Sequence, residues 1–168
     1  MHTLDKPTAV FDQSACALRE ETSEDETFLR RLYASTRAEE MAYVPWPDEQ
    51  KAVFLDMQFD LQYRHYRAYH PQAEFMIVLL GEKPAGRFYL DRNGEAFLLI
   101  DIALAPGYRG QGLGGHLLTN LLAEARAASK PVRLHVETSS HAVKLYQRLG
   151  FISKEDQGIR RLMEWTPH

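Results

Sequence analysis

The chain has 168 residues, the size of one ordinary domain, and its 20 Lys and Arg against 23 Asp and Glu give a formal net charge of −3. Mixed charge of this kind makes no basic field over the molecule, so we expect a small molecule or a peptide as partner rather than nucleic acid. The single cysteine, Cys16, excludes an internal disulfide and a thiolate-rich zinc site, and no metal is expected.

The N-terminal residues 1–13 show no periodicity and contain Pro7, which predicts a loose tail ahead of a single domain over residues 14–168. They also lack the basic segment and apolar core of a signal peptide. Elsewhere no run approaches the roughly 18 apolar residues that a membrane span needs. We therefore expect a cytoplasmic protein with no membrane partner.

The next part of the chain predicts one strand and two helices. The strand covers residues 15–21, and a helix over 22–41 begins at a capping box made by Ser23 and Glu26. The prolines of "VPWP" end that segment, and Asp48 then caps a second helix that ends before Pro71. The apolar residues expected on the core face of this second helix are Val53, Phe54, Met57, Phe59 and Leu61.

Residues 73–106 predict three strands that are antiparallel, because only short turns separate them. The first turn is at Gly81–Pro84. The second contains Asn93 and Gly94, a pair that favours positive φ and a type I′ turn.

The rest of the chain predicts a parallel strand pair followed by a hairpin. A helix over about 111–129 leads to a strand over 132–137, and a connection of that length joins parallel strands. A helix closed by Gly150 and two strands, 151–156 and 159–166, complete the chain. This order predicts an α/β (α+β) fold with a mixed sheet.

A loop crowded with glycine joins an apolar strand to a leucine-rich helix within Leu98–Ala125. Gly110, Gly112 and Gly115 satisfy the pattern G-x-G-x-x-G, and Glu137 ends the next strand about 20 residues further on, as in a dinucleotide-binding domain. Against that interpretation, hairpins precede the loop, and only about 30 residues follow Glu137, too few for the further parallel strands of a doubly wound sheet.

Two other interpretations of the loop are open. In one, its backbone N–H groups and the positive end of the following helix hold a pyrophosphate, and Arg109 adds charge. Glycine suits that role because Cβ atoms would keep the phosphate oxygens away from the amides. In the other, the loop is a tight turn that only packs the helix on the sheet.

The loop resembles the acetyl-CoA pyrophosphate loop of the GNAT superfamily of N-acetyltransferases, whose form is Q/R-x-x-G-x-G/A. In this chain it reads Arg109-Gly110-Gln111-Gly112-Leu113-Gly114.

A second motif, "HVETSSHAVKLYQRLGF", resembles the family's N-x-A-x-x-L-Y-x-x-x-G-F. The matches are Ala142, Leu145, Tyr146, Gly150 and Phe151. Ser140 stands where the family often has asparagine, and a serine there still caps the helix. The resemblance extends over about Cys16 to Trp165, by order of elements rather than by motif in the N-terminal half.

The resemblance implies a GNAT-type acyl-CoA N-acyltransferase fold: a mixed six- to seven-stranded sheet with helices on both faces. It also implies acetyl-CoA as co-substrate. Its pantetheine arm would lie between the strand before the loop and the strand after the loop's helix, which splay apart. The residues that it assigns to cofactor binding are Ile102, Leu104, Arg109, Gly110, Gln111, Gly112, Leu113, Gly114, Gly115, Ser140 and Tyr146.

The implied reaction is direct attack of a primary amine on the thioester in a ternary complex. Tyr146 matches the family's general acid, although a half-buried aromatic on an amphipathic helix also fits. For the general base the candidates are Asp101, then Glu137, then His135. An acid inside an apolar strand is costly to bury alone, so Asp101 is either a cleft residue or paired with a cation such as an arginine.

In this family the first two helices shape the acceptor side. The residues expected to bind the acceptor, a small-molecule or peptide amine, are Trp46, Gln58, Phe59, Gln62 and Tyr66. Ordinary amphipathic packing is the alternative for the same residues.

Catalysis has an alternative too, because a domain that binds acetyl-CoA without turnover would carry the same two motifs. The last strand leaves an exposed edge, on which a second copy can extend the sheet to form a homodimer.

Overall fold

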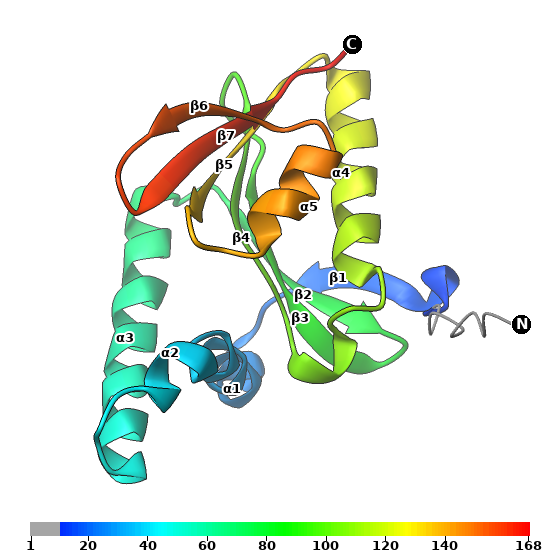
Figure 1. Ribbon diagram of the computed structural model, residues 1–168. Coiled ribbons are helices and arrows are strands. Elements are labelled where there is room, and N and C mark those ends of the chain that lie inside the picture. The colour runs from blue at the N-terminus through cyan, green and yellow to red at the C-terminus, as the bar shows by residue number, and fades with distance from the viewer. Residues whose placement is uncertain (1–10) are drawn as a thin grey trace, which may run out of the picture.

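The computed structural model describes residues 11–168, which form a seven-stranded sheet with helices on both faces (Figure 1). The strands are β1 (Cys16–Glu20), β2 (Glu74–Leu80), β3 (Lys83–Asp91), β4 (Phe97–Leu104), β5 (Val132–Glu137), β6 (Ile152–Asp156) and β7 (Arg160–Trp165), in the order β1-β2-β3-β4-β5-β7-β6. The helices are α1 (Glu26–Thr36), α2 (Ala38–Ala42), α3 (Asp48–Tyr69), α4 (Leu113–Ala128) and α5 (Ala142–Arg148). The mixed sheet expected from the sequence is confirmed.

Helices α4 and α5 cover one face of the sheet, and α1 to α3 cover the other (Figure 1). Two hydrophobic cores follow from this arrangement. The larger one lies under α4 and α5 and contains Leu118 and Leu134, whereas the smaller joins α1 and α3 to the sheet through Leu32, Phe59 and Ile77. Because side chains alternate along a strand, each strand residue belongs to one face or the other.

Part of the expected N-terminal tail belongs to the fold. Residues 1–10 lie outside the described residues, but Phe11 is only 9% exposed and packs edge-on against His116, with 5.4 Å between ring centres. Gln13 begins a 3-10 turn, η1 (Gln13–Ala15), that leads into β1. Phe11 therefore packs in the larger core, although the sequence pattern placed it in the tail.

The first helical segment starts and ends differently from the prediction. The capping box forms one residue earlier than expected, between Thr22 and Asp25, at the start of a 3-10 turn, η2 (Ser23–Asp25). Asp25 is preferred because Arg19 of β1 also pairs with it, at 2.7 Å. The segment then divides at Arg37, which separates α1 from α2.

The predicted core face of α3 is largely wrong. Phe59 is buried, at 4% exposure, but Val53, Met57 and Leu61 are 70%, 50% and 51% exposed. Asp48 is the first helical residue rather than the cap. Apolar residues are distributed around this helix, so their spacing does not select the narrow side that packs on α1.

The turn between β3 and β4 is also not the expected type. Neither Asn93 nor Gly94 has a positive φ, which a type I′ turn requires at both positions. Instead, a carboxylate oxygen of Asp91 accepts from the Asn93 amide at 2.8 Å, and the loop is long enough to reverse the chain without left-handed residues.

Strands β4 and β5 are parallel but separate after three paired positions. The pairs are Phe97 with Val132, Leu98 with Arg133 and Leu99 with Leu134. Beyond them β4 pairs only with β3 and β5 only with β7, so the C-terminal halves of β4 and β5 splay apart.

Within residues 11–168, β4 and β5 are also the only parallel pair. A doubly wound dinucleotide-binding sheet needs several parallel strands, and this topology excludes that alternative.

Candidate active site

A cleft of about 1130 Å³ opens where β4 and β5 separate, on the face covered by α1 to α3. One wall comes from the second half of β4 and from α3, and the other from β5, the start of β7 and α5. Four predicted catalytic residues, Asp101, His135, Glu137 and Tyr146, all line this cleft. The topology therefore brings together side chains from two separated strands and a helix.

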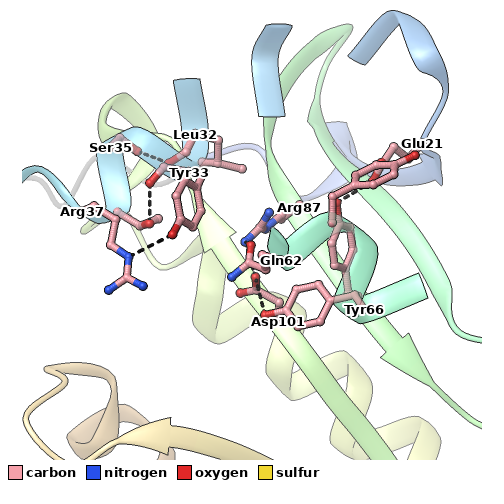
Figure 2. Close-up of polar contacts among 12 residues, drawn as sticks. Glu21, Leu32, Tyr33, Ser35, Arg37, Gln62, Tyr66, Arg87 and Asp101 are labelled. Carbon is pink, nitrogen blue, oxygen red and sulfur yellow. Dashed lines mark hydrogen bonds and ion pairs between the residues drawn. The ribbon is translucent and has the colours of Figure 1, made fainter. Parts of the chain in front are cut away.

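Asp101 is paired with a buried arginine. The side chain of Arg87, on the neighbouring strand β3, is 4% exposed, and its Nη2 donates both to Oδ2 of Asp101 and, at 2.8 Å, to Oε1 of Gln62 on α3 (Figure 2). Tyr66 of α3 donates to the same Asp101 oxygen at 3.5 Å. Gln62 and Tyr66, both predicted for the acceptor side, thus position the Asp101 carboxylate.

The negative charge of Asp101 affects the pKa values of Arg87 and Tyr66. Burial disfavours the charged form of Arg87, but attraction from Asp101 raises the pKa of the guanidinium above its usual value. Burial and the Asp101 charge also raise the pKa of Tyr66, which keeps its hydroxyl protonated as a donor. Arg87 Nε has no hydrogen-bond partner within residues 11–168. The cluster is therefore a cation and a carboxylate held together out of water.

Tyr146 lies across the opening from Asp101, on α5. It is 6% exposed, packs edge-on against Phe151, and has no side-chain hydrogen bond to any residue of the described chain, although its side chain reaches the cleft. Burial, with a contribution from the Asp101 charge, raises the pKa of Tyr146 to about 12. Its phenol is therefore protonated at neutral pH.

His135 and Glu137 share the cleft-facing side of β5, as their spacing predicts. Burial and the positive charge of Arg160 lower the pKa of His135, which favours its neutral form. The Glu137 side chain is 54% exposed and lies 3.9 Å from the guanidinium of Arg37. Glu137 is thus more hydrated than Asp101.

The glycine loop starts α4 with free backbone donors. Gly110 and Gly112 have φ of +72° and +86°, conformations that L side chains rarely adopt, and Gly112 precedes the first helical residue with no side-chain cap. An added Cβ on Gly115 would meet no atom within 4 Å, so the space above the first turn is open. The first-turn amides of α4, beginning with Leu113 and Gly114, therefore fit a bound phosphate group.

Two polar side chains of the loop hold the loop itself. Arg109 donates through Nε to the Leu104 carbonyl at 2.8 Å and through Nη2 to Ser35 of α1 at 3.0 Å. Gln111 donates to the Gly107 carbonyl at 2.8 Å. Arg109 therefore joins the end of β4 to α1, and it does not extend over the loop as a free phosphate ligand.

The other predicted cofactor residues lie along the same path. Ile102 and Leu104 are partly buried against the larger core, Ile102 also lines the cleft, and Leu104 lies 3.8 Å from the position of an added Cβ on Gly114. Ser140 lines the cleft and accepts from the Ala142 amide at 3.2 Å, but the cap position of α5 is His141 rather than the predicted Ser140.

The predicted acceptor residues divide into two groups. Gln58, Gln62 and Tyr66 line the cleft. Phe59 and Trp46 do not: Phe59 is buried against Tyr33, 6.1 Å between ring centres, and Trp46, 38% exposed, packs on Phe54 at 5.5 Å. For these two aromatics the packing alternative is correct.

The sequence prediction missed four arginines of the cleft, Arg37, Arg64, Arg87 and Arg160. Arg87 carried a usable signal, because it is a cation inside the apolar strand "AGRFYL" just as Asp101 is an acid inside its own strand. Arg37 and Arg160 occur at the ends of elements, where arginine is ordinary.

Two further findings limit the chemistry of the described residues. Within 11–168, no group of three or more His, Cys, Asp and Glu side chains is arranged to hold a metal ion. None of the helices in this part of the chain has the length and apolar character required to cross a bilayer.

Comparison with known proteins identifies the family. The sequence profile of the Acetyltransferase (GNAT) family matches residues 27–151, well over half of the chain. The protein therefore belongs to the GNAT acetyltransferase family, as the two motifs indicated.

Individual relatives agree with this assignment. A mycothiol acetyltransferase of Corynebacterium aurimucosum is 41% identical over 68 residues, a match that covers 39% of this chain and only 21% of that protein. The PaiA N-acetyltransferase of Thermoplasma acidophilum, solved with coenzyme A, has a TM-score of 0.64 at 19% identity, over 90% of this chain and 98% of that one. The spermidine N-acetyltransferase of Vibrio cholerae, solved with CoA and spermine, gives 0.62 at 18% identity, over 91% and 96%. At these identities the two structures support the fold.

Proposed function

We propose that the protein is an N-acetyltransferase that transfers the acetyl group of acetyl-CoA to a primary amine by direct attack in a ternary complex. One observation carries the proposal. Tyr146 and Asp101 lie on opposite walls of the cleft that forms where β4 and β5 separate, and β4 leads into the glycine loop. One wall thus holds a phenolic proton and the other a carboxylate.

The cofactor end of the site is the glycine loop. Gly110 and Gly112, both left-handed, and the uncapped amides at the start of α4 fit the pyrophosphate, while Gln111 fixes the loop. Backbone groups of β4 near Ile102 have no strand partner on the β5 side and are free to bind an extended arm, whereas the Leu104 carbonyl accepts from Arg109. Bound acetyl-CoA would supply an activated acetyl thioester at the opening.

The reacting end uses Asp101 and Tyr146. The acceptor must be neutral to attack, and only about one amine in 10³ is neutral at pH 7 when its pKa is near 10.4. Asp101 accepts a proton from the amine, directly or through water, as nitrogen bonds to the carbonyl carbon. Tyr146 donates its proton to the sulfur as the C–S bond breaks, and is reprotonated from solvent. His135 and Glu137 are the other proton acceptors in reach of the cleft.

The proposal extends to the setting of the reaction. We expect a cytoplasmic enzyme without a metal, acting on a small-molecule or peptide amine. The last strand, β7, lies between β5 and β6 and is not the edge expected from the sequence. The exposed edge strand β6 instead offers a surface for a homodimer.

The test is turnover of acetyl-CoA with a panel of amines, measured by the release of free CoA thiol. Amine-dependent thiol release that falls in Tyr146→Phe supports the proposal. Binding of acetyl-CoA, measured separately by calorimetry, with no turnover for any amine would instead assign the chain to the non-catalytic alternative.

A further inference from the structure

The charged side chains that line the cleft are unequal in number. The cations are Arg37, Arg64, Arg87 and Arg160, and the anions are Glu40, Asp101 and Glu137. This is a positive excess in a chain whose own formal net charge is −3. The acceptor cleft is therefore not the acidic pocket that a polycationic amine would prefer.

The ion pairs leave two cations over, Arg64, whose Nε donates to the Asp60 carbonyl of its own helix at 3.3 Å, and Arg160. Arg87 pairs with Asp101, and Arg37 lies 3.1 Å from Glu40 and 3.9 Å from Glu137. All three acids of the cleft are thus matched by two arginines. Arg160 takes part in no ion pair or side-chain hydrogen bond within residues 11–168, although Glu137 is its partner in the strand register.

Arg160 is placed to act on a bound molecule. It is the first residue of β7, lies beside the end of β5, and lines the cleft. Its positive charge lowers the pKa of His135 on β5 and opposes the rise in the pKa of Tyr66 on α3, so it influences residues on both walls of the cleft. Arg160 on β7 and Asp101 on β4 line the same cleft.

One carboxylate oxygen of Asp101 accepts no hydrogen bond within the described residues. Both hydrogen bonds of the carboxylate, from Arg87 and from Tyr66, reach Oδ2, and Oδ1 receives none from any residue in the described chain. The side chain is 18% exposed toward the cleft. An acceptor nitrogen can therefore donate to Oδ1 while Arg87 and Tyr66 hold the carboxylate in place.

We infer, on the basis of the proposed function, that the acceptor is a primary amine that also carries an anionic oxygen group, a carboxylate or a phosphate, close to the amine. Asp101 accepts from the amine, and Arg160 binds the anionic group. A guanidinium recognises both kinds of oxyanion through paired N–H donors. A polyamine has no group for Arg160 and is repelled by it, so it is disfavoured as acceptor.

The experiment compares matched acceptors in wild type and in Arg160→Gln. The pairs are an α-amino acid with its carboxamide, and O-phosphoethanolamine with ethanolamine, with spermidine as the polycation. Each pair gives a ratio of kcat/KM, anionic over neutral. Dividing the wild-type ratio by that of the variant cancels the different basicity of the amines. Arg161→Gln is the control, because Arg161 follows on the same strand but does not line the cleft.

The expected result is that Arg160→Gln lowers the ratio of at least one pair by about tenfold to a hundredfold, the range for a charge-assisted hydrogen bond. The pair that responds identifies carboxylate or phosphate. Arg161→Gln leaves both ratios within about twofold, and both variants keep the wild-type KM for acetyl-CoA.

Two other outcomes contradict the inference. If neutral amines or spermidine are the better acceptors and the ratios do not change in Arg160→Gln, the anionic acceptor is wrong while acetyl transfer stands. If acetyl-CoA binds but no amine in the panel is acetylated, the proposed function falls and the acceptor inference falls with it.

Discussion

Arg87 and Asp101 form an ion pair across neighbouring antiparallel strands, with side chains only 4% and 18% exposed. Gln62 and Tyr66 add one hydrogen bond each to the pair from α3 (Figure 2). Such a pair gains little over an apolar one of similar volume, because two charges must leave water. At the opening between β4 and β5, the pair holds the Asp101 carboxylate against the cleft.

Substitution of Arg87 by Met should destabilise the fold by about 3–5 kcal/mol, because Asp101 is then a buried charge without a counterion. Urea denaturation measures the free energy of unfolding. Arg87→Met combined with Asp101→Leu should lose less than the single variant, since neither charge remains. An Arg87→Met protein within about 1 kcal/mol of wild type would show that water already compensates the carboxylate.

Gly112→Glu should abolish detectable CoA binding, because a side chain and a negative charge would occupy the space next to the helix start. Gly158→Glu is the matched control: Gly112 and Gly158 both have φ of +86°, but Gly158 lies in the turn before β7. The two variants should lose similar stability from the left-handed backbone. Calorimetric titration with CoA separates them, and equal affinities would refute the assignment of the loop.

Tyr146→Phe should lower kcat by about 10²-fold or more while the KM for acetyl-CoA changes little, because the phenol is proposed to act only as the C–S bond breaks. Steady-state kinetics with the best acceptor of the panel measures both constants. A variant with wild-type kcat would leave Tyr146 as a packing residue against Phe151.

Stability should fall in strongly alkaline solution because buried tyrosines must ionise. The pKa of Tyr146 is raised from its ordinary value of 10.0 to about 12, mainly by burial, and the pKa values of Tyr66 and Tyr89 move in the same direction. Between those values the unfolded chain binds fewer protons than the native one, so the stabilisation present below pH 10 is lost as pH rises.

For each such tyrosine the free energy of unfolding should decrease by up to about 1.4 kcal/mol per pH unit. Urea denaturation from pH 9 to 11 measures the slope, which Tyr146→Phe should make shallower. Tyr43→Phe, at a residue that is 90% exposed, is the control. A slope that Tyr146→Phe leaves unchanged would contradict the assigned cause.

Sequence patterns predicted those parts of the site that depend on local chemistry. The glycine loop ahead of α4 and the place of Tyr146 on α5 follow from short motifs whose residues interact within a few positions. Asp101 was predicted with two alternatives, and the arginine partner is confirmed as Arg87. The proposed catalytic role is compatible with that pairing and stays a prediction.

Long-range features could not be predicted in the same way. Phe59 was assigned to the acceptor side because an aromatic on an amphipathic helix fits either a pocket or a core, and only its contact with Tyr33 of α1 decides. Trp46, between two prolines, packs on Phe54 of α3. Arg160 depends on the register of β7 against β5, and Arg37 on the break between α1 and α2. The spacing of nearby residues predicts the position of neither arginine.

The separation of β4 from β5 also gives the sheet four edges where an ordinary one has two. The outer edges belong to β1 and β6, and the two inner ones begin after Leu99 and Leu134. An inner edge offers the same amide and carbonyl groups as an outer one, but helices stand over both faces of the sheet beside it (Figure 1). An inner edge can pair with an extended molecule as with an added strand, and the helices beside it reduce the aggregation hazard that an exposed outer strand carries.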